Sequence, residues 1–159
     1  MTLLKKILPF LFCVFLIFFE KMPFSFSADN QVNVPFIFIA VFYFSLYLPD
    51  SFKVIPVFSL GLLADFLAPS FFGFQTFFLV LLYFVISLMR SLLLKWHFET
   101  LWFAFAFLMV CMDILFSFVL ILFSPYPIDI SYFVVQYILL ILFFPLITMC
   151  CRFLIEKVR

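Results

Sequence analysis

Apolar residues fill six stretches of the chain, and short breaks that contain proline or polar residues separate them. The apolar stretches run roughly over residues 5–24, 34–49, 53–68, 72–89, 100–123 and 130–152. A helix of about 20 apolar residues crosses a lipid bilayer. The pattern therefore predicts an all-α integral membrane protein, with six transmembrane helices in one bundle and a single multi-pass domain over residues 1–159.

The second and third stretches are shorter than the others. Their apolar cores hold about fifteen residues, or about 22 Å of helix, so they would tilt little or lie in a locally thinned bilayer. The alternative is that the two together form one hairpin that does not fully cross.

The basic residues are distributed unevenly between the two predicted sides of the membrane. Six crossings place eight of the nine on the side of both termini, and only Lys21 on the other side. The eight are Lys5, Lys6, Lys53, Arg90, Lys95, Arg152, Lys157 and Arg159. This positive-inside bias predicts that both termini are cytoplasmic. The first stretch could instead be a cleaved signal peptide, but Phe26 stands where a cleavage site needs a small residue.

The composition agrees with a lipid environment, because 69% of the residues are hydrophobic and only 11% are charged. A soluble domain of this size could not bury so much apolar surface. The net charge of +1 and the scattered basic residues argue against nucleic-acid binding. The cysteines lie in or beside apolar runs, which favours packing over a disulfide framework. They are Cys13, Cys111, Cys150 and Cys151.

Few residues in the chain could carry out a reaction. His97 is the only histidine, and a metal site usually needs three or four ligands. The sequence contains no nucleophile-elbow, phosphate-loop or paired Cys–His motif. We therefore expect a protein without enzymatic activity, cofactor or metal.

Two acids lie inside apolar stretches, where a carboxylate that faces lipid costs about 2.5–3.5 kcal/mol. Asp65 is expected in the outer half of the membrane, and Asp113 near its midplane. Such acids can serve ion paths or polar ligand pockets. For Asp65 we favour a structural role, in which the carboxylate accepts backbone N–H groups at the next turn. Asp113 is expected to be protonated, or hydrogen-bonded to Gln136, a tyrosine or a serine across the bundle.

The only two glycines flank Asp65. Gly61 lies four residues before Asp65, on the same helix face, where a missing side chain lets another backbone approach. Gly73 begins the next apolar stretch, where a tight turn needs a positive φ. Together these residues predict a tight helical hairpin held by a carboxylate.

Residues 44–86 resemble the bacterial rod shape-determining protein MreD family. The family shows an apolar span that ends in a Pro-Asp pair, a span that closes in Gly-Leu-x-x-Asp-x-Leu, and a glycine that starts the next span. The corresponding residues here are Pro49, Asp50, Gly61, Leu62, Asp65, Leu67 and Gly73. Phe74-Gln75 and Ala64 depart from the residues that are common at those positions.

The resemblance implies a non-enzymatic scaffold in the inner membrane that supports cell shape and lateral peptidoglycan synthesis. It implies direct binding to MreC, a periplasmic protein with a single membrane span, and through MreC a connection to MreB, RodA and the transpeptidase paired with RodA. The family fold is similar to the membrane substrate-binding subunit of energy-coupling-factor transporters. The outer turns near 25–33, 69–72 and 124–130 are expected to be available to MreC.

A second function class stays open. The chain could be a small-molecule or lipid-binding transport subunit, with a pocket near Asp113 and Gln136. The scarcity of polar residues inside the apolar stretches argues against it. Arg90, Lys95 and Arg152, which are expected on the cytoplasmic side, could contact anionic lipids. The positive-inside rule also explains them, because basic residues on that side fix the orientation of the helices in the membrane.

Overall fold

The computed structural model describes residues 2–20, 34–67, 73–123 and 130–158, and every regular element within these ranges is an α-helix. The six helices are α1 (Thr2–Glu20), α2 (Ile37–Tyr47), α3 (Val54–Leu67), α4 (Phe74–Leu93), α5 (Phe98–Phe123) and α6 (Ile130–Val158). Each one occupies one of the predicted apolar stretches. The all-α prediction is therefore confirmed for the described residues.

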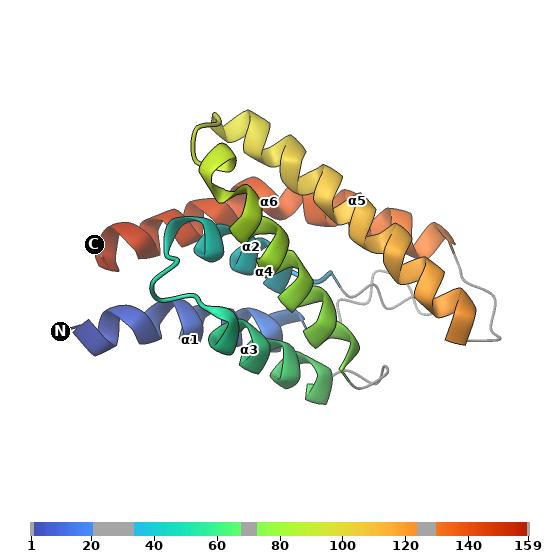
Figure 1. The fold of residues 1–159 in the computed structure, drawn as a ribbon, viewed down its shortest axis with the longest axis horizontal. Helices are drawn as coiled ribbons and strands as arrows, with labels where there is room; N and C mark the ends of the chain where they lie inside the picture. Colours follow the sequence, from blue (N-terminus) through green and yellow to red (C-terminus); the bar gives the residue numbers. More distant parts are fainter. Residues whose placement is uncertain (1, 21–33, 68–72, 124–129, 159) are drawn as a thin grey trace.

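Helix α2 forms the centre of the molecule, between α1, α4 and α6 (Figure 1). Eight of its eleven residues are buried, and they lie on all sides of the helix. A helix that is apolar all round is stable only when other elements surround it. Its 11 residues are about 16 Å long, less than the bilayer core of about 30 Å.

The residues that flank α2 are buried in protein as well. Val34, Phe36 and Phe52 are each 8% exposed or less. The turn after α2 satisfies its own backbone, because the N–H groups of Leu48 and Phe52 donate to the Phe44 and Leu48 carbonyls at 2.8 and 2.9 Å. Non-helical backbone is tolerated at membrane depth when protein surrounds it. The short α2 is therefore compatible with a place inside the bundle.

Phenylalanines from three helices meet in the core. The ring of Phe42 in α2 lies 5.1 Å from that of Phe105 in α5 and 6.2 Å from that of Phe144 in α6. The rings of Phe105 and Phe144 are 4.7 Å apart. Aromatic pairs in this range add about 0.5–1.5 kcal/mol each beyond the burial of their area. Other phenylalanines are exposed, so this residue type both fills the bundle and covers it.

The helices on the two sides of α2 pack differently. Helices α3 and α4 form an intimate antiparallel pair, and α4 also lies against α2. Helix α5 packs chiefly on α6. There the Trp102 indole N–H donates to the Ile141 carbonyl at 3.1 Å, and the Tyr137 hydroxyl donates to the Met109 carbonyl.

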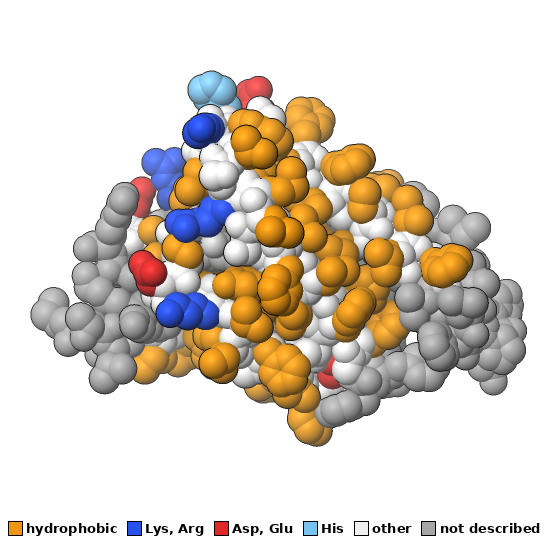
Figure 2. Space-filling model, in the orientation of Figure 1, with side chains coloured by type: hydrophobic (Ala, Val, Ile, Leu, Met, Phe, Trp, Pro, Cys, Tyr) orange, Lys and Arg blue, Asp and Glu red, His pale blue; other side chains and the backbone are white. Residues whose placement is uncertain are grey.

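Among the described residues, three helical stretches are long and apolar enough to cross a membrane: Phe74–Leu93, Phe98–Leu115 within α5, and Val135–Glu156 within α6. The apolar stretches Ile7–Glu20, Ile37–Tyr47 and Val54–Leu67 are shorter. Hydrophobic side chains cover much of the visible surface (Figure 2). The chain is therefore a helical membrane protein, and the count of six crossings stays a prediction.

Consecutive helices run in opposite directions through the molecule (Figure 1). The N-terminus, the C-terminus, the α2–α3 connection and the α4–α5 connection lie on one side (Figure 1). The Lys and Arg side chains visible in Figure 2 gather on that same side. Lys21 and the candidate signal cleavage site around Phe26 lie outside the described residues. The predicted outer turns lie outside them as well, except for the last residue of the third turn.

Candidate functional site

Asp65 lies in the last turn of α3, and its side chain joins α3 to the start of α4. The residue is only 2% exposed. Its Oδ1 atom accepts the backbone N–H of Gln75 at 2.8 Å, and its Oδ2 atom accepts that of Thr76 at 2.9 Å. The Thr76 hydroxyl also donates to Oδ2. Both carboxylate oxygens are therefore occupied.

The position of these bonds identifies Asp65 as a cap for another helix. Gly73 is the N-cap residue of α4, and it has no side chain with which to cap the helix. An N-cap side chain normally binds the amides of the second and third helical residues, which here are Gln75 and Thr76. The carboxylate also lies at the positive end of the α4 dipole, which favours its negative charge. This is the structural role that the sequence predicts for Asp65.

Gly61 allows α3 and α4 to approach closely. A Cβ atom added at Gly61 would lie 2.6 Å from the Cα atom of Thr76 and 3.0 Å from its hydroxyl oxygen. A real Cβ does not fit at that distance, because the nearest atom belongs to backbone. Gly61 and Asp65 share one face of α3, and both contact Thr76. The predicted close backbone approach is therefore present.

Gly73 has a different role from Gly61. Its φ is +90°, and an added Cβ would meet nothing within 4 Å. The residue is thus required by the backbone conformation of the turn and not by a lack of space. The predicted positive φ is confirmed. We use the name acidic hairpin for α3 and α4 joined by Asp65, Gly61, Gly73 and Thr76.

Thr76 is the one member of the acidic hairpin that the sequence analysis misses. It is only 6% exposed and contributes two of the three bonds to Asp65. The sequence contains a signal for it. Thr76 is the third residue after a glycine that begins an apolar stretch, and the third helical residue presents a free amide to a capping group.

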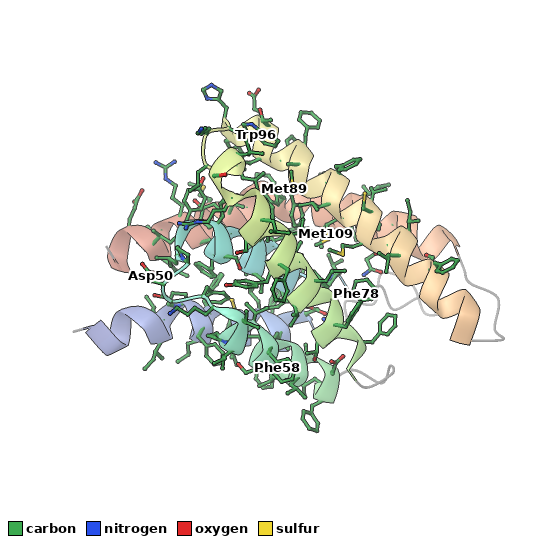
Figure 3. All side chains as sticks on the ribbon, in the orientation of Figure 1. Asp50, Phe58, Phe78, Met89, Trp96 and Met109 are labelled. Atoms are coloured by element: carbon green, nitrogen blue, oxygen red, sulfur yellow. The ribbon has the colours of Figure 1, made fainter. Side chains whose placement is uncertain are left out.

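Pro49 and Asp50 lie at the other end of α3 from Asp65, in the turn that precedes Val54. Asp50 is exposed and lies on the side of the chain termini (Figure 3). Nearby, the Arg90 Nε–H donates to the Leu46 carbonyl at 3.0 Å. This contact places a cation at the negative end of the α2 dipole. Arg90 therefore has a structural contact in addition to its predicted part in the topology.

Asp113 lies in α5, apart from the acidic hairpin, and is half-buried. Within the described residues no side chain or backbone group donates a hydrogen bond to its carboxyl group. The Tyr137 hydroxyl, a predicted partner, donates to the Met109 carbonyl instead. The structure does not bring Asp113 together with Asp65 or Asp50.

The remaining candidate groups are dispersed. His97 and Glu99 are exposed at the α4–α5 connection, Cys13 and Cys151 are buried, and Cys111 and Cys150 are exposed. Across the described ranges no three His, Cys, Asp or Glu side chains form a group that could hold a metal ion.

The hydrogen bonds of Asp65 within the acidic hairpin fix α3 and α4 to each other. A carboxylate has about four lone-pair positions, and the bonds from Gln75 and Thr76 occupy most of those of Asp65. Comparison of the chain with protein-family models, with curated proteins and with solved structures found no match.

Proposed function

We propose that the chain is a non-enzymatic scaffold of the bacterial cell-wall elongation complex, similar to the MreD family, in the inner membrane. The support is the resemblance over residues 44–86 together with what those residues do. Gly61 and Asp65 come from the Gly-Leu-x-x-Asp-x-Leu part of the motif and contact α4, and Gly73, the glycine that follows, starts α4 with a positive φ. A motif with three members at one helical hairpin is expected of a scaffold.

In this proposal the chain crosses the membrane six times, and both termini are cytoplasmic. The opposite directions of consecutive helices in Figure 1 support the even count. The described basic residues Lys53, Arg90, Lys95 and Arg152 come from the connections and the end that share one side. This is the distribution that the positive-inside rule favours. The acidic hairpin then turns at the outer, periplasmic surface.

The proposed partners follow from the resemblance. MreC binds the chain directly, and MreB, RodA and its paired transpeptidase belong to the same complex. The connections described here are short, such as the four residues between Leu93 and Phe98. A protein whose described connections are this short contacts its partners mainly through helix surfaces and turns. Membrane lipids cover the rest.

The observation that carries the proposal is the closed state of the acidic hairpin. A transport subunit, the other candidate, needs a polar chamber that its substrate can enter between helices. The Asp65 carboxylate cannot line such a chamber, because it is 2% exposed and its oxygens already bind α4. No described contact favours the transport function over the scaffold.

The test is co-purification with MreC of the same organism. The chain, tagged at its C-terminus, is extracted from native membranes in mild detergent and, in parallel, in polymer-bounded lipid discs. We expect MreC to be retained in both preparations and to be absent with an equally expressed, unrelated multi-span protein carrying the same tag. Absence of MreC from both preparations of the chain contradicts the proposal.

A further inference from the structure

Most of the described side chains of helix α5 are exposed or only partly buried by the rest of the molecule. It packs chiefly on α6, and in Figure 1 it runs along the edge of the bundle. Phe103, Phe107, Ile114 and Phe118 are between 63% and 71% exposed. Their spacing of four, seven and four residues places them on one face. In a membrane protein this face contacts lipid or another membrane helix.

A second line of residues runs along the edge of that face and differs from it in chemistry. Its members are spaced by four, three and four residues, and each is at least partly exposed. They are Ala106, Val110, Asp113 and Ser117. Three of these four are small or polar, whereas the exposed face beside them is mainly aromatic. Small residues let another helix approach closely in a membrane.

Asp113 is the residue on this edge that needs a partner. It lies about 22 Å along α5 from Phe98 and about 15 Å from Phe123, far from both ends of the helix. Its carboxyl group has no hydrogen bond from any described residue, and the nearby Tyr137 hydroxyl is committed to Met109. A carboxyl group without a partner in the membrane costs several kcal/mol, and such groups usually pair.

The possible partners can be narrowed by chemistry. Acyl chains contain no polar atom, and lipid headgroups and bulk water lie at the bilayer surfaces, far from the middle of α5. A second copy of the chain would oppose Asp113 with another acid, which can bond only when at least one of them is protonated. A side chain that donates hydrogen bonds from another transmembrane helix fits best.

We propose that the edge of α5 around Asp113 is a docking site for a transmembrane helix of a partner protein. That helix carries a hydrogen-bond donor near mid-membrane, such as Ser, Thr, Asn, Gln, Lys or Arg, which binds the Asp113 carboxyl group. Ala106 and Ser117 let its backbone approach α5. The inference deepens the proposed function and rests on it, because it names the surface on which the membrane span of MreC would lie.

The first test measures whether the Asp113 carboxyl group is accessible from the lipid. A hydrophobic carbodiimide adds to protonated carboxyl groups within membranes and leaves a stable N-acylurea that mass spectrometry can locate. The full-length chain is labelled in lipid discs, first alone and then in complex with MreC. Asp65 is an internal control, because its buried oxygens are bonded and should not react.

We expect Asp113 to be labelled in the isolated chain and protected in the complex. Equal labelling in both samples overturns the docking site, and so does the absence of labelling in the isolated chain. Protection that increases with the chain-to-lipid ratio in the absence of MreC identifies a second copy as the occupant and overturns the heterologous site.

The second test uses a pair of variants. Asp113→Leu should weaken retention of MreC by about three- to twenty-fold, the range expected for one hydrogen bond between membrane helices. Asp113→Asn still donates and accepts hydrogen bonds, and should stay within about threefold of the wild type. Neither variant should lower the stability of the isolated chain, because Asp113 has no partner there.

The outcomes separate this inference from the scaffold proposal. If wild type and Asp113→Leu retain MreC equally, the docking site is overturned and the scaffold stands. If wild type fails to retain MreC, the scaffold falls, and the site falls with it. A loss of retention that accompanies unfolding of isolated Asp113→Leu also overturns the site, because Asp113 would then act within the chain.

Discussion

Replacing Asp65 by leucine removes the group that joins α3 to α4 without greatly changing the volume of the side chain. The backbone N–H groups of Gln75 and Thr76 then lose their acceptor in a buried position. The Thr76 hydroxyl can rotate to another acceptor, so the two amides dominate the cost. At about 1–3 kcal/mol for each stranded group, Asp65→Leu should destabilise the protein by about 4 kcal/mol.

Asp65→Asn distinguishes hydrogen bonding from charge. Its carbonyl oxygen can still accept one of the two amides, but its NH₂ group cannot accept the other. About half of the loss, or about 2 kcal/mol, should remain. Asp50→Asn is the matched control, because Asp50 is exposed on the same side of the chain as the termini. It should change stability by less than about 0.5 kcal/mol.

The assay is reversible unfolding in mixed micelles, followed by circular dichroism as the fraction of denaturing detergent is increased. A loss below about 1 kcal/mol for Asp65→Leu would show that the capping bonds do not stabilise the acidic hairpin. Equal losses for Asp65→Leu and Asp65→Asn would assign the effect to the charge and refute the capping argument.

The two glycines should respond to alanine for different reasons. Gly61→Ala places a Cβ atom 2.6 Å from the Thr76 backbone, so the helices must separate, at a cost of about 1–3 kcal/mol. Gly73→Ala meets no neighbour and should cost about 1–2 kcal/mol through its left-handed backbone alone. Cysteine pairs across α3 and α4 should therefore crosslink less efficiently in Gly61→Ala and normally in Gly73→Ala. Reduced crosslinking in both variants, or in neither, would contradict this distinction.

The sequence predicts the helices and the acidic hairpin well because both depend on local patterns. Uninterrupted apolar stretches give the six helices, and the spacing of Gly61, Asp65 and Gly73 gives one shared face and one turn. The sequence predicts the ends of the helices less accurately. Helix α4 continues to Leu93 and α6 to Val158, past the predicted limits of 89 and 152. Apolarity marks the membrane-embedded part of a helix but not where its hydrogen bonding stops.

The sequence does not predict contacts between residues that are far apart in the chain. Nothing local indicates that Arg90 binds the carbonyl of Leu46, 44 residues away. The Tyr137 hydroxyl could have bonded to Asp113, and only the packing of α5 on α6 directs it to the Met109 carbonyl. The central place of α2 is likewise a result of packing. Its apolar residues predict burial, in lipid or in protein, without saying which.

The most direct test of the account is the topology, because the side of the acidic hairpin and the depth of Asp113 both depend on it. Alkaline phosphatase, which is active only in the periplasm, is fused after Arg159 and, separately, between residues 124 and 129. The account predicts no phosphatase activity after Arg159 and high activity between residues 124 and 129. A reporter that fluoresces only in the cytoplasm should give the reverse, with signal after Arg159 and none between residues 124 and 129. Phosphatase activity after Arg159 would contradict an even number of crossings with a cytoplasmic N-terminus.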